Sequence, residues 1–177
     1  MKKLLFLTAL VAAAVGAQAQ GTVAFNNHST AVSAPVFDVG GSTLVSGPSI
    51  VAALFFNGVQ QGDAAPFRTG NGAGYWNPGS DSTRVINGVA AGASATLEVR
   101  AWEVAKGATF DAAVAAGGKY GKSDPFTIAA LGGQGPSGPP ATPADMTGFK
   151  SFSLIPEPST IALGALGAAA LLLRRRK

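Results

Sequence analysis

The chain has 177 residues with 24 glycines, 11 prolines and no cysteine, and its formal net charge is +4. The missing cysteine excludes disulfides, thiol catalysis and thiolate metal sites. Six of the 13 basic residues lie at the two ends of the chain, so residues 20–155 carry seven basic and eight acidic side chains. This near-neutral middle gives no support to a nucleic-acid partner.

The first part of the chain has the order of a secretory signal peptide. A pair of lysines precedes an apolar stretch over residues 4–15, and Ala17 and Ala19 fit the small-residue site of a signal peptidase. We therefore predict a signal peptide over residues 1–19 and a mature chain that begins at Gln20.

Residues 20–155 are rich in Gly, Ala, Ser, Thr and Pro, and their short apolar stretches are separated by turn residues. This pattern favours strands over helices. The predicted strands cover residues 22–26, 35–39, 49–56, 83–89, 95–104, 125–129 and 148–154. Their number and spacing predict a mainly β chain with a single antiparallel β-sandwich or jelly-roll-like domain.

Two of these strands have the clearest sequence patterns. Residues 50–56 are continuously apolar and precede the turn pair Asn57-Gly58, which predicts a central strand covered on both faces. Residues 95–104 alternate, so Leu97, Val99 and Ala101 share one face and the opposite face is expected to be partly exposed.

One short helix is predicted over residues 110–116. Thr109 is its expected N-cap, Asp111 lies in the first turn and Gly117-Gly118 ends it. A helix of about seven residues is not stable alone, so it must pack on the sheet. The Pro and Gly content of residues 131–145 predicts an irregular loop.

Three aromatic residues allow two interpretations. Tyr75 and Trp76 lie in a Gly-rich loop, and Trp102 lies on the more polar face of its strand. In the first interpretation they form a platform that stacks on sugar rings, and Glu98 and Arg100 hydrogen-bond the sugar hydroxyls from the same face. In the second, which we favour, the loop folds over Trp102 and the aromatics form a small core.

Other candidate chemistry is sparse. His28 is the one histidine, which we expect on the surface or in a loop, and no cofactor or metal site is predicted. The carboxylates are scattered and do not form a calcium-loop pattern. The sequence leaves one alternative undecided: the fold could bring two carboxylates together as a glycosidase pair, because such carboxylates need only lie about 5 to 9 Å apart in space.

The C-terminal part combines a short motif, an apolar run and a basic cluster. Pro156, Glu157 and Pro158 precede a predicted transmembrane helix over residues 159–173. Its apolar part, residues 161–173, would span about 20 Å as a helix against a hydrocarbon core of about 30 Å, which predicts a weak anchor. The expected cytoplasmic stop signal consists of Arg174, Arg175, Arg176 and Lys177.

This segment, residues 156–177, resembles the PEP-CTERM sorting signal of Gram-negative bacteria. The resemblance implies export by the general secretory system, a transient hold in the inner membrane and processing near Pro156-Glu157-Pro158 by the membrane enzyme exosortase. It also implies an association with exopolysaccharide, biofilm or cell-surface material. A permanent single-span anchor is the alternative.

We therefore expect a signal peptide, a β-rich extracellular domain over residues 20–155 and a sorting signal over residues 156–177. Signal peptidase and exosortase are the expected processing enzymes, and the protein is expected at the cell surface or outside the cell. The expected role is structural or interactive rather than enzymatic. A polysaccharide-binding module and a carboxylate-based glycan-active enzyme are the alternatives.

Overall fold

The computed structural model describes residues 20–135 and 138–156. The predicted signal peptide, with Ala17 and Ala19, lies outside the described residues, as does the sorting tail from Glu157 onward. Within the described part, no helix is long and apolar enough to cross a membrane.

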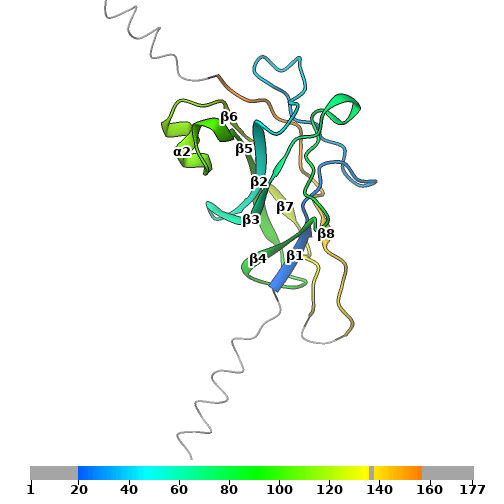
Figure 1. Ribbon diagram of the computed structural model, residues 1–177. Coiled ribbons are helices and arrows are strands. Elements are labelled where there is room, and N and C mark those ends of the chain that lie inside the picture. Colours follow the sequence, from blue (N-terminus) through cyan, green and yellow to red (C-terminus); the bar gives the residue numbers. More distant parts are fainter. Residues whose placement is uncertain (1–19, 136–137, 157–177) are drawn as a thin grey trace, which may run out of the picture.

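The described chain is mainly β and forms two sheets (Figure 1). The strands are β1 (Gln20–Ala24), β2 (Ile50–Phe56), β3 (Val59–Pro66), β4 (Thr83–Ala90), β5 (Ala95–Glu103), β6 (Tyr120–Lys122), β7 (Phe126–Ile128) and β8 (Ala144–Asp145). One sheet has the order β4-β1-β8, and the other has the order β3-β2-β5-β6 with β7 also paired to β5. The pairs are antiparallel except for β1 with β8. The two described ends of the chain leave the domain on opposite sides (Figure 1).

Strand β2 is the central strand that the sequence predicts. It lies between β3 and β5, and Ala53 and Leu54, whose side chains point to opposite faces, are both fully buried. The next two residues form a turn with φ of 49° at Asn57 and 78° at Gly58. Positive φ at both positions is the geometry of a type I′ hairpin, which leads the chain back as β3. The turn prediction is confirmed, and β3 is a strand beyond those predicted.

Strand β5 has the predicted inner face. Leu97, Val99 and Ala101 are all at most 1% exposed and belong to the main core. The opposite face is partly exposed as expected at Thr96, but Trp102 on that face is 1% exposed. A second buried cluster covers this end of the strand.

Two hydrophobic clusters lie on opposite faces of the five-stranded sheet. The main core joins both sheets, with Val23 and Ile86 from one and Leu54 and Val99 from the other. The outer cluster lies beneath the short helix and consists of Ala53, Phe55, Trp102, Phe110 and Ala113. Figure 1 shows the helix on the side of this sheet away from β1 and β4.

The helix α2 (Phe110–Ala115) confirms the prediction for this segment. The hydroxyl of Thr109 accepts a hydrogen bond from the Ala112 N–H at 3.3 Å, and Asp111 lies in the first turn. Two 3-10 turns, η1 (Gly70–Gly72) and η2 (Val104–Lys106), complete the elements. The helix buries Phe110 and Ala113 against the sheet, as its short length requires.

Two predicted strands are wrong. Residues 35–39 and 148–154 contribute isolated bridges, in which Phe37 pairs with Leu44 on one side and with Ser153 on the other. Pro35 supplies no N–H, and Gly40 has φ of 90°, so the segment cannot extend into a ladder at either end. The loop over residues 131–145 is irregular until β8 at its end, as predicted in the main.

Candidate functional site

Trp76 lies in the main core and not on a surface. Its side chain is fully buried, its ring stacks on Phe25 with centroids 4.7 Å apart, and Phe67 and Phe149 meet it edge-on. The indole N–H donates to the Phe25 carbonyl at 3.1 Å. The ring of this tryptophan is therefore packed inside the protein, and its indole N–H is hydrogen-bonded there.

A buried asparagine fastens the Trp76 loop to the rest of the core. The Asn27 side-chain amide donates to the carbonyls of Ala34 and Gly74 at 2.9 and 3.0 Å, and its oxygen accepts a hydrogen bond from the main-chain N–H of Trp76 at 3.1 Å. Asn27 is fully buried. The Gly-rich loop is thus held by hydrogen bonds from one side chain, a contact that no sequence pattern indicated.

Trp102 lies in the outer cluster, on the other face of the sheet. Its indole N–H donates to the Gly107 carbonyl at 3.2 Å, and Phe110 of α2 packs edge-on against it at 6.2 Å. The predicted glycan platform of Tyr75, Trp76 and Trp102 is corrected by this geometry, because the structure separates the two indoles and buries both. The alternative of one small core is also wrong, since Trp76 and Trp102 belong to two different clusters and Tyr75 belongs to neither.

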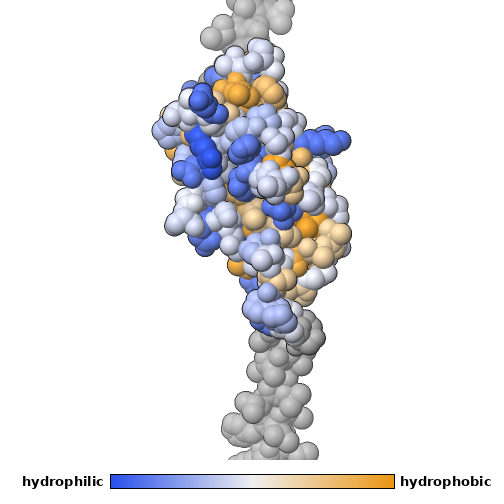
Figure 2. Space-filling view, turned by 90° about the vertical axis from the view of Figure 1, so that its right-hand side faces the viewer, coloured by the Kyte–Doolittle hydropathy of each residue, from blue (hydrophilic) through white to orange (hydrophobic). Residues whose placement is uncertain are grey.

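The surface of the described residues agrees with this correction. On the face shown in Figure 2, apolar residues form separate patches toward the two ends of the domain, with polar residues between them. The exposed large hydrophobic residues are Val39, Leu44, Val59, Val85, Val104 and Ile155. None of them is aromatic, so they provide no stacking surface for a sugar ring.

The ring of Tyr75 contacts the histidine and not a tryptophan ring. Its hydroxyl is 3.1 Å from the Ser33 hydroxyl, and its ring centroid lies 4.4 Å from that of His28. His28 is exposed in the loop after β1, as expected from the sequence. This ring pair lies at the surface, whereas the side chain of the next residue, Trp76, packs in the main core.

The polar pair expected to bind sugar hydroxyls is engaged internally. Arg100 forms an ion pair and hydrogen bond with Glu98, and its guanidinium lies over the rings of Phe55 and Phe110 at 4.3 and 5.2 Å. Guanidinium groups stack favourably on aromatic faces. The Arg100 guanidinium therefore covers part of the outer cluster while it is paired with Glu98.

The fold brings two carboxylates to one depression. Asp63 and Asp81 line a cavity of about 470 Å³ together with Arg84, whose guanidinium donates to the main-chain carbonyls of Asp63, Asp81 and Thr83. Hydrogen bonds from the main chain and side chain of Thr83 lower the pKa of Asp81 below its ordinary value. A glycosidase general acid requires a raised pKa, so Asp81 does not fit that role.

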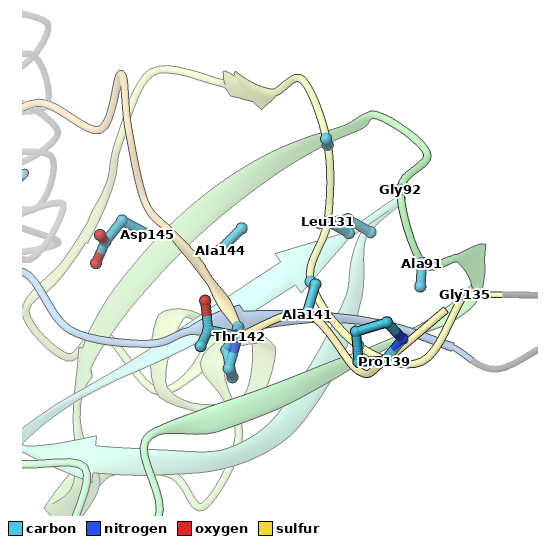
Figure 3. A pocket seen from close by; sticks show the side chains of 13 residues that line it. Ala91, Gly92, Leu131, Gly135, Pro139, Ala141, Thr142, Ala144 and Asp145 are labelled. Atoms are coloured by element: carbon cyan, nitrogen blue, oxygen red, sulfur yellow. The ribbon is translucent and has the colours of Figure 1, made fainter. Parts of the chain in front are cut away.

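A second depression lies beside the irregular loop (Figure 3). It has a volume of about 570 Å³, and its lining is mostly small or apolar, as at Leu131, Pro139 and Ala144, with Thr142 and Asp145 as polar members. Asp145 alone is titratable among the described residues of the lining. In the described part of the chain, no three His, Cys, Asp or Glu side chains form a possible metal site.

The segment before the predicted sorting motif is built into the fold. The Phe152 carbonyl accepts from the Phe37 N–H at 2.9 Å, and the Leu154 N–H donates back to the Phe37 carbonyl at 2.9 Å. Ile155 then pairs with Tyr120 of β6, donating its N–H at 2.7 Å and accepting the Tyr120 N–H at 3.5 Å. The chain is therefore hydrogen-bonded to the body up to the residue before Pro156. Residues 152–155 are called the docked segment, and the pairing of Ile155 with Tyr120 is called the docking contact.

A glycine allows this close approach. A Cβ atom at Gly121 would lie 2.9 Å from the Ser153 carbonyl oxygen and about 3 Å from the side chains of Phe152 and Leu154. Contacts this short are not tolerated, so a residue with a side chain would displace the segment. The sequence predicted a strand over residues 148–154, but nothing in it identified β6 and Phe37 as the partners.

Comparison with known proteins identifies the C-terminal tail that this docked segment carries. Residues 154–177 match the family model described as the PEP-CTERM protein-sorting motif. The chain carries a PEP-CTERM motif. The resemblance found in residues 156–177 is thereby confirmed, and the motif supports export through the membrane to the cell surface with sorting by an exosortase. Searches of curated proteins and of solved structures found no match.

The PEP-CTERM match overlaps the folded body. Its first residue, Leu154, is 1% exposed in the main core, and its second, Ile155, is paired with β6. Pro156 is exposed. In the described chain, no spacer separates the last hydrogen-bonded residue of the domain from the first residue of Pro156-Glu157-Pro158.

Proposed function

We propose that this protein is exported, held briefly at the inner membrane and then processed into a component of the cell surface or extracellular matrix. In this proposal, residues 1–19 direct secretion, residues 159–173 form a temporary membrane helix, and Arg174–Lys177 stay cytoplasmic. The match of residues 154–177 to the PEP-CTERM motif carries the proposal. A helix too short for stable spanning suits an anchor that is held only until it is cut.

For the body, we propose a structural or interactive role in exopolysaccharide or biofilm material. Support comes from the use of its aromatic and charged side chains in packing, as at Trp76, Trp102 and Arg100. The core shared by both sheets also supports a single β-sandwich that is stable without disulfides. Such a domain serves as a durable unit of a surface layer.

The two alternatives receive less support from the geometry. A polysaccharide-binding module built on Trp76 and Trp102 needs exposed indoles, and both are buried. A carboxylate-based enzyme needs a general acid as well as an ionised carboxylate, and Asp81, whose pKa is lowered, does not fit the role of the acid. We therefore propose sorting to the surface, and not glycan turnover, as the function of the chain.

The proposal is tested by fractionating native host cells that express the parent chain or a variant with Pro156, Glu157 and Pro158 replaced by alanine. The parent should appear as a shortened product in the medium and matrix, and the variant should stay at full length in the membrane fraction. A matched control replaces the exposed loop residues Pro139 and Pro140 by alanine and should behave as the parent. An identical distribution of all three proteins would refute the proposal.

A further inference from the structure

We propose that the folded body restrains the processing of its own sorting tail. In this inference, which rests on the proposed function, Ile155 must leave its pairing with β6 before exosortase acts at the adjacent motif. The docked state is then an autoinhibitory contact, and the rate of processing follows the fraction of molecules in which the contact is open.

The backbone groups of Ile155 are already occupied in the docked state. Its N–H and its carbonyl are both hydrogen-bonded to Tyr120 of β6. Enzymes that recognise an extended peptide bind it through the same main-chain groups, as in strand addition to a sheet edge. While Ile155 is paired with Tyr120, the residue before the motif has no free main-chain group to offer.

The strength of the docking contact changes sharply along the segment. Ile155 is 46% exposed, so its release breaks the two bonds to Tyr120 and exposes little new apolar surface. Leu154 is 1% exposed and Phe149 is 6% exposed, so release beyond Ile155 removes core residues. Local opening costs the least free energy where buried apolar contacts are fewest. We therefore expect the segment to open at Ile155 and to stay in place from Leu154 inward.

The two partners of the docked segment are themselves tied together. Phe37 holds the segment at residues 152 and 154, and Tyr120 holds it at residue 155. Asp38, next to Phe37, forms an ion pair with Lys119, next to Tyr120, with the Lys119 Nζ 3.1 Å from the nearer carboxylate oxygen. The segment thus lies against two backbone partners whose neighbouring residues are joined by an ion pair.

A reversible lock tests the inference. Ile155 and Tyr120 exchange both hydrogen bonds of an antiparallel pair, a geometry with Cα atoms about 5.5 Å apart that a disulfide can bridge. The double variant Tyr120→Cys with Ile155→Cys closes the docking contact in the oxidising exterior, and the parent has no other cysteine to interfere. Pulse-chase labelling of the full chain in its native host then measures the half-time of conversion to the shortened form.

The locked chain should be processed at least about tenfold more slowly than the parent, because processing follows the open fraction. Addition of a membrane-permeable reductant should restore the parent rate. The single variants Tyr120→Cys and Ile155→Cys are the matched controls and should not slow processing. A locked chain that is processed at the parent rate would overturn the inference.

A second variant changes the rate in the opposite direction without altering the docking contact. A short Gly-Ser linker inserted between Ile155 and Pro156 frees the motif while the body stays docked. Processing should become faster by about fourfold to a hundredfold, because the two hydrogen bonds to Tyr120 each shift the equilibrium by roughly twofold to tenfold. If the parent is processed and the linker has no effect, the inference fails while the proposed function stands. If the parent is never shortened, both fail.

Discussion

Replacement of Trp76 by alanine tests whether this residue is a core residue or a binding residue. The indole is fully buried against Phe25, Phe67 and Phe149, and its N–H is bonded to the Phe25 carbonyl. Truncation of a buried tryptophan costs about 3–5 kcal/mol through lost transfer energy and the cavity left behind. The unpaired Phe25 carbonyl adds about 1 kcal/mol or more. We expect Trp76→Ala to lower the free energy of unfolding by about 4–6 kcal/mol.

The assay is urea unfolding, followed by the fluorescence of Trp102 and by circular dichroism. Because small domains are stable by only about 5–15 kcal/mol, the variant Trp76→Phe should be measured as well, with an expected loss of about 1–3 kcal/mol. Tyr75→Ala is the matched neighbour and should cost less than either, because Tyr75 is only partly buried. A loss below about 1 kcal/mol for Trp76→Ala would refute the assignment of Trp76 to the core.

Three smaller changes have defined outcomes. Thr109→Ala removes the N-cap of α2 and should lower the free energy of unfolding, measured by urea unfolding, by about 1 kcal/mol. Gly58→Ala places a Cβ at φ of 78° in the β2–β3 turn and should cost about 1–2 kcal/mol. The pKa of Asp81 is lowered in the folded state, so its contribution is present above its unfolded pKa and is lost as the pH falls through its folded pKa. The melting temperature of Asp81→Asn should therefore fall less than that of the parent when the pH is lowered below about 4.

The sequence predicted the parts of the fold that local chemistry decides. The continuous apolar run of β2, the pair Asn57-Gly58 and the Thr109 cap each specify a conformation within a few residues, and the structure confirms all three. The inner face of β5 followed from alternation for the same reason. These features need no knowledge of distant partners.

The features that the sequence did not predict depend on contacts between segments that are distant in the chain. Strands β6 and β8 have three and two residues, and they pair because the fold brings β5 and β1 beside them. Alternation placed Trp102 on the second face of β5, but it could not show that α2 covers that face. The same limit explains the docked segment before Pro156, since its partners Phe37 and Tyr120 are far away in the sequence.

The most direct test of sorting with processing is the intact mass and C-terminal peptide map of the protein recovered from the membrane, medium and matrix of its native host. We predict a product in the medium or matrix that begins at Gln20 and ends within Pro156-Glu157-Pro158. A chain that retains Arg174–Lys177 and stays in the membrane fraction would show a permanent anchor and would contradict sorting with processing.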